Sequence, residues 1–78
     1  MNNQDIYATI YNGIHKLTDI DPNIYFGNNS HNILVCFHGN IPSETTSLEI
    51  QKMLRKFGNT VYNSLRKYNY VEFIVVEN

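Results

Sequence analysis

The chain has 78 residues, of which 42% are hydrophobic, and six Lys and Arg stand against seven Asp and Glu. This length allows one domain, residues 1–78, and leaves no room for a second. The formal charge of −1 excludes a globally basic nucleic-acid binder and an acidic disordered tail. So small a domain often needs a second source of stability. Because the single Cys36 excludes an internal disulfide, oligomerisation is the candidate we expect.

Location and source are also suggested by the composition. No stretch approaches the roughly 18 consecutive apolar residues of a membrane span, and the first residues lack a basic, apolar leader. We therefore expect a cytoplasmic protein with no membrane partner. Twelve Asn and nine Ile against one Ala follow AT-rich codon usage. This usage favours a low-GC bacterium, or a phage or mobile element within one, as the source.

The first half of the chain predicts one helix and one hairpin. Apolar residues at helical spacing predict a helix from about Asn3 to about Leu17, capped by Asn2 or Asn3. Pro22 lies in the turn that ends it. A short strand over residues 24–26 and an apolar strand over 33–38 follow, joined by the turn-rich segment 27–32.

The second half predicts a long helix and a last strand. Thr46 and Glu49 have the spacing of a capping box, and a helix of about 24 residues is expected to begin there. Its apolar stripe is Ile50, Leu54, Phe57, Val61, Leu65 and Tyr68, which continues in phase through Gly58. At 1.5 Å per residue this helix would be ~36 Å long and would overhang a body about 30 Å wide.

The segment Tyr70–Val76 is rich in β-branched and aromatic residues and predicts the last strand. The expected fold class is therefore α+β in the order α-β-β-α-β. It would have a small three-stranded, mainly antiparallel sheet, a short N-terminal helix and one long amphipathic helix.

Positive charge is concentrated in the predicted long helix. No acidic residue occurs between Ile50 and Val71, and this stretch holds five of the six Lys and Arg. On a helical projection the cations lie opposite the apolar stripe, and two Asn lie among them. This cationic ridge is a candidate partner-binding surface, although a solvated helix face explains it equally simply. It consists of Lys52, Arg55, Lys56, Asn59, Asn63, Arg66 and Lys67.

A second candidate surface lies on the first predicted helix. Tyr7, Tyr11 and His15 recur at a spacing of four and form an aromatic stripe beside the isoleucines. Such a stripe suits contact with a protein or stacking on a base, or it simply widens the apolar face of the helix.

A third candidate follows from the strands, which lack a clean apolar and polar alternation. One face of the sheet carries Leu34, Cys36, Ile74 and Val76, which is more apolar than an isolated monomer would show to water. We expect these four residues to form a dimer interface. Cys36 and His38 share this side of their strand, but two residues do not complete a metal or nucleophile site.

No sequence motif of phosphate binding, acyl transfer or metalloprotease chemistry is present. We therefore expect a non-enzymatic protein-binding module, a homodimer, without catalytic residues, metal, cofactor or small-molecule substrate. A phage- or mobile-element-encoded inhibitor of a host bacterial protein is one instance of this expectation. The alternative is a nucleic-acid-binding protein that uses the cationic face of the long helix.

Overall fold

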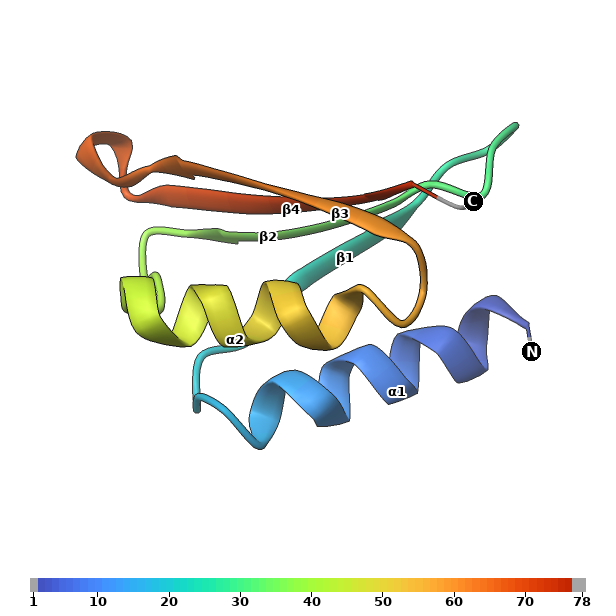
Figure 1. Cartoon of the computed structure of the whole chain (residues 1–78), viewed down its shortest axis with the longest axis horizontal. Helices are drawn as coiled ribbons and strands as arrows, with labels where there is room; N and C mark the ends of the chain where they lie inside the picture. The colour runs from blue at the N-terminus through green and yellow to red at the C-terminus, as the bar shows by residue number, and fades with distance from the viewer. Residues whose placement is uncertain (1, 77–78) are drawn as a thin grey trace.

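The computed structural model describes residues 2–76 and has two layers, in which two helices cover one face of a four-stranded antiparallel sheet (Figure 1). The strand order in the sheet is β1-β2-β4-β3. In chain order the elements are α1 Asn3–His15, β1 Asn23–Phe26, β2 Ile33–His38, α2 Glu44–Leu54, β3 Asn59–Leu65, the 3₁₀ turn η1 Arg66–Tyr68, and β4 Tyr70–Val76.

The first half of the prediction is confirmed. The side chain of Asn2 accepts a hydrogen bond from the backbone N–H of Asp5 at 2.9 Å, which satisfies a donor that the helix cannot pair itself. Ile10 and Ile14, from the predicted stripe, are fully buried. The hairpin is present with the predicted loop, because β1 ends at Phe26 and pairs there with Ile33, the first residue of β2.

The predicted long helix is wrong, and with it the three-stranded sheet. α2 covers only Glu44–Leu54 and begins at the N-cap Ser43, whose hydroxyl accepts from the N–H of Thr46 at 3.2 Å. A turn follows, and the chain then enters β3, which pairs with β4 at every position from Asn59 to Leu65. The fold is thus α+β with two helices and four antiparallel strands in the order α-β-β-α-β-β.

The sequence around Gly58 explains why the helix stops. Gly58 and Asn59 are both poor helix formers, and they are followed by Thr60, Val61 and Tyr62, which favour strands. The spacing of four that links Phe57, Val61 and Leu65 is an even number. It therefore keeps side chains on one face of a strand as well as on one face of a helix.

The core lies between the helices and the inner face of the sheet. Ile10, Ile14, Ile50 and Leu54 from the two helices are all fully buried. They form one cluster with buried inner-face residues of the two central strands. These inner-face residues are Ile33, Val35 and Phe37 of β2, and Val71, Phe73 and Val75 of β4. Both helices lie on this side, so no element among residues 2–76 covers the opposite face (Figure 1).

Candidate functional site

The uncovered side of the sheet, here called the outer face, presents an apolar row across all four strands. The pairing register places Tyr25 beside Leu34, Leu34 beside Ile74, and Ile74 beside Val61. Residues that are directly paired in an antiparallel sheet point to the same side, so these four side chains stand next to one another. The same rule adds Asn23, Cys36, His38, Asn59, Asn63, Leu65, Tyr70, Glu72 and Val76 to the outer face.

Solvent exposure concentrates apolar side chains on this face. Of the seven large hydrophobic residues that are exposed among residues 2–76, four lie on the outer face and a fifth, Tyr68, lies at its end. Tyr25 is 57% exposed and Val61 is 50% exposed. Exposed apolar residues scattered singly are ordinary, but a contiguous row of them indicates a contact surface.

Three polar groups of the outer face are hydrogen-bonded to one another. Glu72 is its only acidic side chain, and the carboxylate accepts from the Tyr70 hydroxyl at 2.8 Å and from the Asn63 amide at 3.0 Å. None of the thirteen outer-face residues is Lys or Arg. The face therefore has no cation for a phosphate backbone.

A shallow hollow of about 540 Å³ lies at one end of the outer face, where Cys36 meets aromatic residues. Burial raises the pKa of the Cys36 thiol above its ordinary value, and hydrogen bonding to Tyr70 offsets this only in part. Burial also raises the pKa of the Tyr70 hydroxyl, with a further contribution from its hydrogen bond to Glu72. Both groups therefore stay protonated at neutral pH, which is the opposite of what an activated thiolate needs.

The structure brings the predicted dimer-interface residues together. Leu34, Cys36, Ile74 and Val76 all lie on the outer face, on the two central strands. Sequence reasoning missed Tyr25, Val61 and Leu65, which extend the same surface to both edges. The strand-favouring run Thr60, Val61 and Tyr62 after Gly58 was the available signal, but the helical interpretation of that segment concealed it.

The cationic ridge does not exist as one helix face. Lys52 lies in α2, Arg55 and Lys56 in the turn after it, Asn59 and Asn63 in β3, and Arg66 and Lys67 in η1. The guanidinium of Arg66 makes three hydrogen bonds within the fold. It donates to the carbonyl of Pro42 at 2.8 Å, to the Ser47 hydroxyl and to the Glu44 carboxylate. These contacts leave it little freedom to bind a partner. Tyr62, which lies in the same stretch of the chain, stacks on Phe73 in the core at a centroid distance of 5.0 Å.

The aromatic stripe is present on α1 as a continuous stack. The rings of Tyr7 and Tyr11 are 6.0 Å apart, and those of Tyr11 and His15 are 4.5 Å apart. Asp21, in the loop before β1, accepts from the Tyr11 hydroxyl at 2.8 Å and lies 2.8 Å from Nε2 of His15. These two contacts of Asp21 therefore hold the loop against α1, a role that the sequence spacing did not indicate.

The Asp21 anchor predicts a pH dependence of stability. The hydrogen bond from Tyr11, and then that from His15, holds the pKa of Asp21 below its ordinary value of 3.8. A carboxylate with a lowered pKa contributes stability above its unfolded pKa and loses it as the pH falls. We expect the thermal midpoint of the wild type to fall more steeply than that of Asp21→Asn below about pH 4. Parallel midpoint curves for the two proteins would contradict this role for Asp21.

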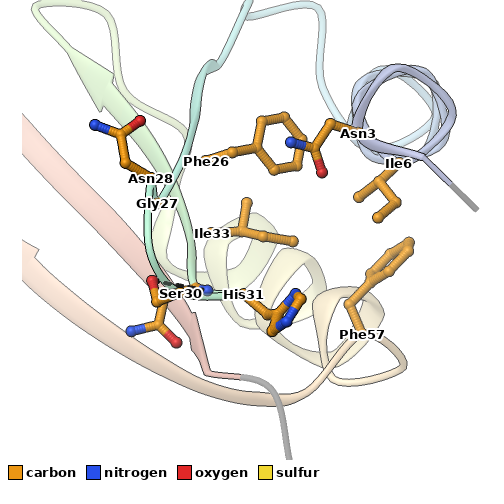
Figure 2. Close-up of a pocket in the computed structure, with 10 residues that line it drawn as sticks. Asn3, Ile6, Phe26, Gly27, Asn28, Ser30, His31, Ile33 and Phe57 are labelled. Atoms are coloured by element: carbon orange, nitrogen blue, oxygen red, sulfur yellow. Dashed lines mark hydrogen bonds between the residues drawn. The ribbon is translucent and has the colours of Figure 1, made fainter.

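A second hollow, of about 550 Å³, opens at one end of the core between the start of α1, the β1–β2 loop and Phe57 (Figure 2). Ile6, Phe26, Ile33 and Phe57 form its apolar part, and side chains of Asn, Ser and His line the rest. The lining contains no Asp, Glu, Lys or Arg, so it offers no charged pair for acid-base chemistry.

Within residues 2–76, no three His, Cys, Asp or Glu side chains are placed to hold a metal ion. The same residues contain no helix long and apolar enough to cross a membrane. No protein-family model, curated protein or solved structure matches this chain. The case for a function therefore depends on the surfaces described above.

Proposed function

We propose that this chain is a protein-binding module without catalytic activity, and that it pairs with a second copy of itself through the outer face of the sheet. The observation that carries this proposal is the apolar row Tyr25, Leu34, Ile74 and Val61, which crosses the whole sheet with no helix over it. Face-to-face packing of two such sheets, about 10 Å apart, would bury the row of each copy against the other.

The thirteen outer-face residues include one acidic group and no Lys or Arg. The carboxylate of Glu72 accepts hydrogen bonds from Tyr70 and Asn63, which offset part of the cost of removing it from water on association. The predicted helix that would overhang the body is absent, because α2 ends at Leu54, so the outer face is the surface left for the dimer.

The size of the face limits the affinity of the proposed dimer. The four strands are about 4.8 Å apart and the two longest have seven residues, so the face spans at most roughly 19 by 23 Å, or ~400 Å². Stable, specific interfaces bury about 800 Å² on each partner. We therefore expect a weak dimer that dissociates on dilution, not an obligate one.

Lysine at Val61 is expected to abolish this dimer. Val61 is 50% exposed on an edge strand, so the monomer should tolerate the substitution. A two-fold interface would contain the new charge twice, and each ammonium group would lose its water without gaining a partner. Light scattering across a concentration series should give a wild-type mass rising toward twice the chain mass of 9.1 kDa, and 9.1 kDa throughout for Val61→Lys.

Leu48→Lys is the matched control, because Leu48 is also 50% exposed but lies on α2, away from the outer face. It should leave the wild-type mass curve unchanged. A wild-type mass of 9.1 kDa at every concentration would overturn the dimer. Equal loss of mass in both variants would show that association uses another surface.

A further inference from the structure

The two edges of the sheet differ in how well they are protected against pairing with another chain. Exposed edges attract additional strands, and proteins usually protect them by short length, proline, charge or a bulge. β1 has four residues and follows Pro22 directly. β3 has seven residues, no proline and no charged side chain, and its register with β4 is continuous. Among residues 2–76, β3 has only β4 as a strand neighbour, so its other edge is open.

The residues that flank β3 are strongly basic. Lys52, Arg55 and Lys56 precede the strand and Arg66 and Lys67 follow it, while no acidic residue occurs between Ile50 and Val71. Arg66 is held by its contacts with α2, but the other four cations are exposed. The residues of the predicted ridge are thus distributed along an open strand edge and its two ends.

This charge pattern disfavours a second copy of the chain as the occupant of the edge. If two β3 strands paired antiparallel about a two-fold axis, Arg55 and Lys56 of one copy would face the region of Lys67 in the other. Like charges opposed across a strand pair are destabilising. A strand that complements the charge of this edge would be an extended segment with acidic residues at both ends.

We propose that β3 binds an extended, acidic-flanked segment of another protein as an added strand. The centre of this segment is uncharged and about seven residues long, to match the length of β3. Backbone hydrogen bonds to the open edge supply the affinity, and Asp or Glu at the ends of the segment faces the flanking cations.

The side chains of β3 add a further requirement on the segment. Val61, Asn63 and Leu65 are exposed on the outer face, while Thr60 and Tyr62 point toward α2. The added strand would therefore place every second side chain beside Val61 and Leu65, where apolar residues fit best. The Gln51 amide donates to the carbonyl of Thr60 at 3.0 Å and must move aside if that carbonyl pairs with the segment. This binding mode uses the edge, so it does not depend on the proposed dimer.

The test begins with a displayed library of random 12-residue peptides selected on the immobilised full chain. Enriched peptides should have an uncharged, proline-free centre and Asp or Glu at the ends. The strongest peptide is then synthesised with N-methyl groups on one or the other set of alternate residues. Because only one set donates hydrogen bonds to β3, one N-methylated version should lose binding by calorimetry and the other should keep it. Failure to enrich any peptide, or equal effects of both sets, would overturn the proposal.

Charge-reversal variants test the flanking cations. Lys56→Glu combined with Lys67→Glu should weaken peptide binding about tenfold, since both side chains are exposed at opposite ends of the strand. Lys16→Glu is the control, because Lys16 is the one cation of the chain outside residues 52–67, and it should change affinity less than about twofold. Equal weakening of peptide binding by the double variant and by Lys16→Glu would overturn the proposal. Displacement of the peptide by oligonucleotides would also overturn it, and would favour nucleic acid as the ligand.

Discussion

Phe73→Ala is expected to remove a large part of the stability of the fold. Phe73 is fully buried in the central strand β4, where Tyr62 stacks on its ring at 5.0 Å and Phe37 meets it edge-on at 6.3 Å. Removing a buried phenylalanine ring costs about 3 to 5 kcal/mol. At roughly 0.05 to 0.15 kcal/mol per residue, a domain of this length has about 4 to 12 kcal/mol of stability in total. The loss therefore approaches the whole stability at the lower end of that range.

Two companion variants separate this effect from a general sensitivity to mutation. Phe73→Leu keeps most of the volume and should cost about 1 to 2 kcal/mol. Tyr68→Ala removes an aromatic ring that is 65% exposed, so it should change the free energy of unfolding by less than about 0.5 kcal/mol. Urea denaturation followed by circular dichroism gives the free energy of unfolding of all three variants. A cost for Phe73→Ala no larger than that for Tyr68→Ala would mean that the core is not centred on β4.

Central elements were predictable because their patterns are unambiguous. β2 was expected over residues 33–38 and is Ile33–His38, and β4 was expected and found over Tyr70–Val76. Both are dense runs of β-branched and aromatic residues that end at Gly, Asn or turn segments. The stripe that predicted the first helix is Ile6, Ile10, Ile14 and Leu17, with spacings of four, four and three. The spacing of three is compatible with a helix but not with one face of a strand. The first three residues lie in α1, and Leu17 follows two residues after its end.

Residues 59–65 could not be assigned by spacing alone. Val61 and Leu65 follow Phe57 at steps of four, which fit a helix and a strand equally well. The structure decides through burial, since Val61 is 50% and Leu65 is 45% exposed, whereas Thr60 is only 8% exposed and Tyr62 packs against the core. The residues that looked like a buried stripe are on the open face of the sheet. Pairing with β4, which the spacing within residues 59–65 does not reveal, outweighs the helical stripe.

The candidate surfaces were predictable to different degrees for the same reason. The apolar outer face could be recognised because β2 and β4, which carry its centre, were assigned correctly. Its extension onto Val61 and Leu65 required knowing that β3 exists. The concentration of cations between Ile50 and Val71 was visible in the sequence. The prediction placed these cations on one face of a helix, whereas the structure places them at the two ends of an edge strand.

Arg66→Ala is expected to destabilise the fold by about 2 to 3 kcal/mol, although arginine is usually a surface residue. Its guanidinium joins η1 to the start of α2 through the Pro42 carbonyl at 2.8 Å and the Ser47 hydroxyl at 3.2 Å. Ser47 is fully buried, so losing this donor leaves its oxygen poorly satisfied. The same guanidinium also donates to the Glu44 carboxylate at 3.2 Å. Urea denaturation of the variant provides the measurement.

Arg66→Lys and Glu44→Gln identify which of these contacts matters. Lysine keeps the charge but lacks the planar fork that reaches several acceptors at once, so Arg66→Lys should recover less than half of the lost stability. Glu44→Gln removes the charge of an ion pair whose acidic side chain is 57% exposed, and it should cost less than about 1 kcal/mol. If Glu44→Gln cost as much as Arg66→Ala, the ion pair would be the main contact. If Arg66→Lys were fully stable, positive charge alone would suffice, and the hydrogen bonds to Pro42 and Ser47 would contribute little to joining β3 and η1 to α2.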